Sequence, residues 1–262
     1  MNKLSIFQVD AFTDQVFSGN PAAVCILENW LSDHTMQKIA SENNLAETAF
    51  VVKEDSHYLI RWFTPTIEVD LCGHATLASA FVLRYFFDME ADLFEFNSQR
   101  SGKLFVCFKD DIFTLDFPAD ELQEIECPSF FYSIFDVEIL KCLKGKTDYL
   151  LIFKNQDAVF SANPNFNDLA KINCRGVMIS APGEKVDFVS RFFAPQSGVD
   201  EDPVTGSAHT SLTPYWSKIL DKKIMNAQQI SKRGGDLTVE DCGDRIKISG
   251  KAVLYLEGTI YY

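Results

Sequence analysis

One short pattern occurs twice in this chain, about half its length apart. Residues 61–65 read R-W-F-T-P, and residues 191–195 read R-F-F-A-P. Each copy leads into a turn that contains a glycine, at 72–74 and at 205–207, and then into a helix-like run. A repeat of half the chain predicts two similar domains, with a shared site at the turns, where the two copies differ most.

Most of the predicted secondary structure is β-strand. Short β-rich segments bounded by turn residues predict strands at 4–11, 22–27, 49–53, 58–63, 93–96, 104–108, 112–117, 149–153, 157–160, 176–180, 187–193, 237–239, 245–249 and 252–261. Helix-like spacing is found at 31–43, 73–87, 133–143, 166–171 and 206–220. Ser32 is the expected N-cap of the first helix, and 73–87 is apolar nearly all round, which predicts a buried helix.

Two strand-rich halves that each hold one buried helix predict an α+β fold. The boundary between them is expected near 117–128, an acidic stretch flanked by Phe117-Pro118 and Cys127-Pro128. We therefore predict one domain over residues 1–117, joined by the last strand at 252–262, and a second domain over 118–251.

The composition favours a cytoplasmic protein that acts on a small molecule. The 262 residues include 24 Lys and Arg against 37 Asp and Glu, and the net charge of −13 repels nucleic acid and anionic membranes. Seven scattered cysteines with no C-x-x-C spacing argue against a zinc module and a disulfide framework, so we expect no metal. No G-x-G-x-x-G or P-loop motif is present, so we expect no nucleotide cofactor. No run approaches the roughly 20 apolar residues of a membrane span.

The two glycine-containing turns are candidate anion sites. Each stands where a buried helix is expected to begin, and a helix N-terminus stabilises a nearby anion by about 0.3–1 kcal/mol. Gly73 and Gly206 would let the backbone approach a substrate carboxylate, or they only permit close packing. Arg233, in the later turn R-G-G-D, could supply a counter-charge to an anionic substrate.

Glu47 is the candidate proton carrier. It lies between a helical segment and an apolar strand, in N-L-A-E-T-A-F, where shielding from water would favour the protonated form that a general acid needs. The alternative is a solvated acid at the entrance of a strand. His74 and Asp202 stand beside the two helix starts, where they could orient substrate, relay a proton or act only as caps. Ser207 and His209 are two apart on a helix and face different sides, which disfavours a hydrolase triad.

Five motifs of this chain closely resemble those of the PhzF phenazine-biosynthesis-like family. They are F-T-D-Q-V-F-S-G-N-P-A-A-V (12–24), N-L-A-E-T-A-F-V (44–51), L-C-G-H-A-T (71–76), E-D-P-V-T-G-S-A (201–208) and R-G-G-D-L-T-V (233–239). The resemblance implies two domains of the diaminopimelate-epimerase type, each a curled β-sheet or barrel around a central helix, often in a homodimer.

The resemblance also implies a reaction. The namesake of the family isomerises trans-2,3-dihydro-3-hydroxyanthranilate without a cofactor, by moving a proton within the substrate. Its catalytic glutamate matches Glu47, and its supporting histidine, aspartate and serine match His74, Asp202 and Ser207.

The resemblance further places Gly73 and the Gly19-Asn20 turn in the substrate site. Related epimerases and proline racemases use two cysteines as opposed acid and base, whereas this chain has Cys72 at the first position and Pro203 opposite it. We therefore predict a cofactor-independent isomerase that uses one glutamate on a small carboxylate-bearing metabolite. A racemase or epimerase that uses Cys72, and a non-catalytic protein that binds small anions, are the open alternatives.

Overall fold

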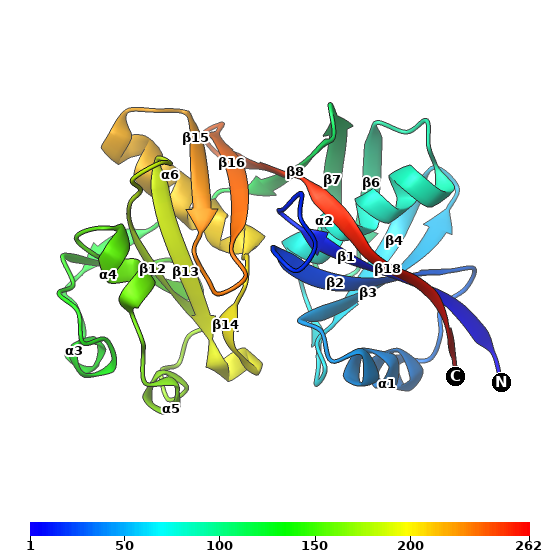
Figure 1. Cartoon of the computed structure of the whole chain (residues 1–262), viewed down its shortest axis with the longest axis horizontal. Helices are drawn as coiled ribbons and strands as arrows, with labels where there is room; N and C mark the ends of the chain where they lie inside the picture. The colour runs from blue at the N-terminus through cyan, green and yellow to red at the C-terminus, as the bar shows by residue number, and fades with distance from the viewer. The chain divides into compact units, whose positions relative to one another are not determined.

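The computed structural model describes all of residues 1–262 and divides the chain into two compact units (Figure 1). Unit 1 consists of Met1–Asp116 and Ser249–Tyr262, and unit 2 consists of Phe117–Ile248. Both units are mixtures of helices and strands, and the sheet is open, not closed. The predicted α+β fold is therefore confirmed, whereas the two predicted domains, 1–117 with 252–262 and 118–251, stay a prediction.

Unit 1 consists of a β-sheet that packs against two helices. Its strands are β1 (Lys3–Ala11), β2 (Asn20–Leu27), β3 (Glu47–Glu54), β4 (His57–Phe63), β5 (Glu68–Val69), β6 (Leu93–Ser98), β7 (Gly102–Lys109), β8 (Ile112–Pro118) and β18 (Ala252–Tyr261). Its helices are α1 (Asp33–Asn43) and α2 (Gly73–Val82), and a π-helical turn, η1 (Leu83–Phe87), extends α2. The strand order is β18–β1–β2–β3–β4–β6–β7–β8, with parallel pairs only at β2–β3 and β4–β6.

Unit 2 repeats this plan. Its strands are β9 (Gln123–Ile125), β10 (Lys141–Lys144), β11 (Asp148–Ile152), β12 (Gly176–Pro182), β13 (Phe188–Ala194), β14 (Val199–Asp202), β15 (Ile224–Gln229), β16 (Gly235–Asp241) and β17 (Arg245–Gly250). Its helices are α3 (Phe130–Ile134), α4 (Gln156–Ser161), α5 (Phe166–Leu169), η2 (Pro195–Ser197), η3 (Gly206–Ala208) and α6 (His209–Leu220). The order β9–β10–β11–β12–β13–β15–β16 matches that of unit 1, again with two parallel pairs, β11–β12 and β13–β15.

Helix α2 forms the centre of unit 1, where it contacts β1, β2 and β3 (Figure 1). All ten of its residues are buried, as its nearly continuous apolar sequence predicts. Its two buried hydroxyls are satisfied within the helix, because Thr76 donates to the Cys72 carbonyl at 2.6 Å and Ser79 donates to the Ala75 carbonyl at 2.7 Å. A helix that is buried on every side holds its first turn in a fixed place.

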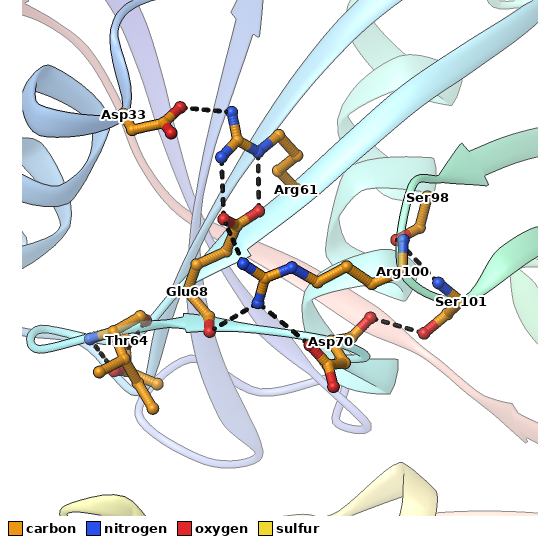
Figure 2. Close-up of polar contacts among 9 residues, drawn as sticks. Asp33, Arg61, Thr64, Glu68, Asp70, Ser98, Arg100 and Ser101 are labelled. Atoms are coloured by element: carbon orange, nitrogen blue, oxygen red, sulfur yellow. Dashed lines mark hydrogen bonds and ion pairs between the residues drawn. The ribbon is translucent and has the colours of Figure 1, made fainter.

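The repeated arginines share two interactions in the two units. Figure 2 shows Arg61 on β4 with two nitrogens on Glu68 and a third on Asp33. The two hydrogen bonds to Glu68 are 2.7 and 2.8 Å long. The guanidinium of Arg61 also lies over the Phe63 ring, 5.2 Å from its centroid. Arg191 on β13 binds Glu201 with the same two nitrogens and lies 5.0 Å from the ring centroid of Phe193. The sequence repeat is therefore also a repeat of side-chain contacts.

Two of the predicted elements are wrong. Residues 157–160, predicted as a strand, form helix α4, because the Asn155 side chain caps it by accepting from the Ala158 amide at 3.0 Å. Residues 133–143, predicted as one helix, contain the end of α3 and then strand β10. Strand β10 pairs with β9 and β11, so tertiary pairing overrides the local helical spacing.

Most other elements agree with their predicted ranges, including α1 with its Ser32 cap. Strands β5, β9, β10, β14 and β15 were not predicted, and all but β15 are four residues or shorter. No helix in the structure combines the length and the apolar character that crossing a bilayer requires.

Candidate active site

Glu47 and His74 meet inside unit 1. Glu47 is the first residue of β3 and pairs with Ala22 of the parallel strand β2, and His74 is the second residue of α2. The Oε2 atom of Glu47 lies 3.2 Å from Nε2 of His74, and their side chains are 16% and 4% exposed. The distance is that of an ion pair, although its angles fall outside those of a well-aligned hydrogen bond.

Asn20 and Cys72 approach the other side of the same imidazole. Asn20, the first residue of β2, places its amide nitrogen 3.1 Å from Nδ1 of His74. The Cys72 sulfur lies 3.5 Å from Nδ1 and 4.0 Å from Nε2. The β2–β3 pairing and the buried first turn of α2 thus bring together four polar groups from three segments of the chain.

The protonation states of this cluster follow from burial and charge. Burial raises the pKa of the Cys72 thiol to about 11, and the nearby Glu47 adds to that shift. Burial alone would lower the pKa of His74, but Cys72 and Glu47 outweigh it and hold that pKa well above its usual value. The acidic groups on either side of the buried imidazole therefore favour its protonated form.

Gly73 and Gly19 shape the backbone beside this cluster. Gly73 opens α2, whose first N–H groups have no partner within the helix and therefore offer donors to an anion. Gly19 has a φ of +65°, and a Cβ atom there would lie 2.2 Å from the Ala11 carbonyl oxygen. The backbone itself thus requires glycine at position 19, and its role in binding substrate stays a prediction.

Asp202 belongs to a second cluster, in unit 2. Its carboxylate accepts a hydrogen bond of 2.5 Å from the Thr205 hydroxyl. Gln229, at the end of β15 and fully buried, donates to the Asp202 carbonyl at 2.7 Å and accepts from the Thr205 amide at 2.9 Å. The sequence analysis did not identify Gln229 as a site residue. The only sequence signal for such a role is its inward-facing position on a strand.

Ser207, in η3, contacts a residue that the sequence analysis also missed. The Ser207 hydroxyl accepts a hydrogen bond of 2.8 Å from Arg175. Arg175 is held from behind by Asp148, which is 2% exposed and which Arg175 binds with two nitrogens. The half-exposed guanidinium of Arg175 is therefore a fixed positive charge beside Ser207.

The remaining predicted residues of unit 2 lie on its turns. Gly206 is buried at the start of η3, and Arg233 is half-buried between β15 and β16. His209 is fully buried, and its Nδ1 lies 2.9 Å from the Thr205 carbonyl, so this imidazole packs in the core. His34 is exposed, and His57 is half-buried and pairs with Glu54.

The offset of 130 residues between Arg61 and Arg191 would place Val177 opposite Glu47, and the strand register corrects this equivalence. Thr48 pairs with Phe63 in unit 1, and Val177 pairs with Phe193 in unit 2, so the position equivalent to Glu47 is Gly176. A Cβ at Gly176 would meet the Phe192 ring at 2.2 Å, which leaves no room for a side chain.

The second correction concerns the position equivalent to Cys72. Cys72 is the N-cap of α2, and Thr205, not Pro203, is the N-cap of η3. Neither correction restores a second acid or a second thiol, so the asymmetry between the units stands.

Comparisons with known proteins agree with this fold. The family model described as phenazine biosynthesis-like protein matches residues 9–258. A Pseudomonas aeruginosa protein named as an uncharacterized isomerase is 48% identical over 259 residues, which are 99% of each chain. The crystal structure of a PhzF-family protein from Enterococcus faecalis is 44% identical, covers 100% of both chains and superimposes with a TM-score of 0.96.

A more distant structure shares the fold alone. A hydroxyproline epimerase from Agrobacterium vitis superimposes with a TM-score of 0.61 at 11% identity, over 98% of this chain and 92% of that chain. The near-complete match of the family model, together with relatives above 40% identity over almost the whole length, identifies the family. The chain belongs to the phenazine biosynthesis-like (PhzF) family.

Proposed function

We propose that the protein is an isomerase that moves a proton within a small carboxylate-bearing metabolite and needs no cofactor. The general class is supported by the names of the relatives, since curated proteins up to 49% identical are named isomerases. The observation that carries the specific proposal is the contact between Glu47 and His74 beside the first turn of α2.

Glu47 is the group that takes the proton from carbon and returns it. Its carboxylate is only 16% exposed, so a base at this place competes with little water. The imidazolium of His74 offsets the negative charge that develops on the substrate when its proton is removed. The first amides of α2, beside Gly73, are suitable donors for the substrate carboxylate.

A single acid/base fits the asymmetry of the two units. Unit 2 has Gly176 where unit 1 has Glu47, and Thr205 where unit 1 has Cys72. Inversion of a carbon centre by two opposed groups lacks its second group, whereas removal and return of a proton by one carboxylate needs none. We propose that Asp202, Ser207 and Arg233 bind polar groups of the substrate, and that the protein works as a homodimer.

Proton NMR in D₂O tests the proposal. The panel contains small unsaturated and amino-acid carboxylates, including 2,3-dihydro-3-hydroxyanthranilate, and compares wild type with Glu47→Gln. We expect deuterium at a substrate carbon with wild type and a rate at least about 100-fold lower with the variant. The matched control is Glu54→Gln on the same strand, because Glu54 also lies 3.2 Å from a histidine but is 56% exposed.

The use of Cys72 as a base is the second candidate, since its sulfur lies 3.5 Å from Nδ1 of His74. It predicts exchange that survives Glu47→Gln and disappears with Cys72→Ala. Our proposal predicts the reverse, so the pair of variants separates the two. Exchange with none of the compounds would favour the non-catalytic, anion-binding alternative.

A further inference from the structure

Unit 2 has a guanidinium and a hydroxyl where unit 1 has its acid and its imidazole. Gly176 is the position equivalent to Glu47, and Arg175 directly precedes it in the chain. His74 and Ser207 each stand two residues after the N-cap of their own helix, so they are equivalent as well. Arg175 donates a hydrogen bond of 2.8 Å to the Ser207 hydroxyl. The structural repeat therefore matches the candidate acid/base pair of unit 1 with a pair of different chemistry in unit 2.

The side chain of Arg175 is held in one orientation. Its Nε donates to Oδ1 of Asp148 at 2.9 Å, and one Nη donates to Oδ2 of the same carboxylate. Asp148 is 2% exposed and begins β11, which pairs with the start of β12 directly after Arg175. The guanidinium carbon also lies 5.3 Å from the centroid of the Phe192 ring. Because the guanidinium is already ordered, binding a ligand to it costs little further conformational entropy.

The groups that Arg175 and Ser207 leave unused are all hydrogen-bond donors. A guanidinium has five N–H groups and no acceptor, and Asp148 and Ser207 accept from three of the five N–H groups of Arg175. The Ser207 hydroxyl accepts one of these bonds, so its own proton cannot point at Arg175 and has no acceptor in the structure. Two N–H groups and one O–H group therefore remain. The Arg175 side chain is 38% exposed and Ser207 is half-buried, so a ligand can reach both.

Nearby acids cancel much of the charge of the guanidinium. Burial alone would lower the pKa of Arg175, but Asp148, Asp202 and Asp120 outweigh it and raise that pKa, so the side chain stays charged. The same carboxylates weaken the long-range attraction of an anion. Recognition at this place consequently depends on directed hydrogen bonds, which favour a planar group with two acceptor oxygens.

We propose that Arg175 and Ser207 form a subsite for a carboxylate, in which one oxygen accepts from Arg175 and the other accepts from the Ser207 hydroxyl. A carboxylate is an acceptor only and matches this set of donors, whereas an ammonium group would leave every donor unpaired. That this carboxylate belongs to the substrate rests on the proposed function. Since a first substrate carboxylate is proposed beside Gly73, the substrate is then a dicarboxylate.

Acetate binding tests the subsite without any substrate. Side-chain ¹H–¹⁵N NMR spectra observe the guanidinium of Arg175 directly, and its signals are assigned by their loss in Arg175→Lys. Acetate, titrated at constant ionic strength, should shift these signals saturably with a Kd in the millimolar range. Acetamide should bind at least about 10-fold more weakly, because it lacks the charge that strengthens each hydrogen bond.

One variant and one control separate the subsite from a general effect of charge. Ser207→Ala removes a donor but leaves the ion pair of Arg175 and Asp148 intact, so the protein should fold and the Arg175 signals should remain observable. Acetate should bind to this variant about 10-fold more weakly. Lys144→Gln is the control, because Lys144 is a cation of unit 2 whose ammonium lies over the Tyr149 ring, 3.7 Å from its centroid. Its loss should change the acetate affinity by less than about 2-fold.

Proton exchange connects the subsite with the reaction. The D₂O panel is extended by small unsaturated dicarboxylates and their monoamides. For a dicarboxylate that exchanges, Arg175→Lys should raise KM at least about 10-fold and lower kcat less, because an ammonium cannot reproduce the planar fork of the guanidinium. Conversion of the recognised acid group to an amide should raise KM strongly for wild type and only slightly for Arg175→Lys.

The failure of the subsite and the failure of the proposed function give different results. No saturable shift with acetate, equal binding of acetamide, or an unchanged acetate affinity in Ser207→Ala overturns the subsite. Acetate binding as expected, with exchange of none of the compounds, supports the subsite and contradicts the proposed isomerase. Exchange of monocarboxylates as fast as that of dicarboxylates supports the isomerase and overturns the dicarboxylate as its substrate class.

Discussion

Arg61 and Arg191 occupy the same place in the two units. Each binds a glutamate with Nε and one Nη, and each lies over the phenylalanine two residues further along its own strand. They differ in what the remaining nitrogen binds. Arg61 reaches the carboxylate of Asp33, whereas Arg191 donates to carbonyls at and just beyond the end of α4, including that of Ala162 at 2.6 Å.

This difference predicts unequal costs of breaking the two ion pairs. Glu201→Gln leaves the nearly buried charge of Arg191 with neutral acceptors only, and we expect a loss of about 3 kcal/mol in the free energy of unfolding, the low end for buried pairs. Glu68→Gln should cost less, because Asp33 still balances Arg61. Urea unfolding of the two variants measures both values.

The control for these variants is the exposed pair of Lys103 and Glu95, whose side chains are 64% and 32% exposed. Glu95→Gln should cost less than about 1 kcal/mol. Equal losses for Glu201→Gln and Glu95→Gln would contradict the structural importance of the repeated pair.

A shorter acidic side chain tests whether the exact position of the Glu47 carboxylate matters for the reaction. Glu47→Asp keeps the charge but withdraws it by one methylene from His74. A misplacement on the order of 1 Å costs roughly 100-fold in rate, so exchange should fall by about that factor while substrate binding changes little. Saturation kinetics of the D₂O exchange measure the two effects separately, and a large change in KM alone would argue for a binding role of Glu47.

Gln229 should be a positioning residue for Asp202. Gln229→Leu removes its contacts with the Asp202 carbonyl and the Thr205 amide, and each buried polar group left unpaired costs about 1–3 kcal/mol. We expect a loss of at least about 2 kcal/mol in stability, measured by urea unfolding. Its neighbour Gln228 is half-buried and points to the other face of the strand, so Gln228→Leu should stay within about 0.5 kcal/mol of wild type.

His209 makes the stability of unit 2 depend on pH. Burial lowers the pKa of His209 to about 4, although its contact with the Thr205 carbonyl opposes this, whereas an unfolded histidine titrates near 6.5. Between these values the unfolded chain binds more protons than the folded one. The contribution of His209 is therefore fully present above pH 6.5 and decreases as the pH falls towards 4, by about 3 kcal/mol in total.

His209→Asn removes this titration and keeps a donor for the Thr205 carbonyl. The loss of stability between pH 7 and pH 5 should consequently be smaller in the variant than in wild type, measured by urea unfolding at both values. An identical loss would show that carboxylates alone cause the acid sensitivity.

The sequence predicts most of this fold because its strands alternate between buried and exposed residues and its central helix is apolar on all sides. The strand at 112–117, whose residues are alternately half-buried and buried, and the helix at 73–87 are examples of these two patterns. The prediction of a strand at 157–160 is wrong because an Ala-Val-Phe run has strand propensity. Only the capping by Asn155 and the packing around the segment make this segment a helix.

The site was predictable in part for a related reason. Glu47, His74 and Asn20 lie in compact motifs, and the structure brings them together. Gln229 and Arg175 act on Asp202 and Ser207 across 27 and 32 residues, and no local spacing signals such contacts. The equivalence of Glu47 with Gly176 was missed because the loops between the repeated strands differ in length, and only the hydrogen-bonded register resolves it.

Because β1 pairs with β18, unit 1 can be completed only after all of unit 2 has been synthesised. β18 follows every other strand of the two units in the chain, and it pairs with β1 along nine residues of the first strand, up to the backbone hydrogen bonds between Asn2 and Tyr262. Until then, the edge of β1 that pairs with β18 has no partner strand. A ribosome that stops before residue 252 would therefore release a chain whose first strand has an open edge, the kind of surface that recruits other unfolded chains.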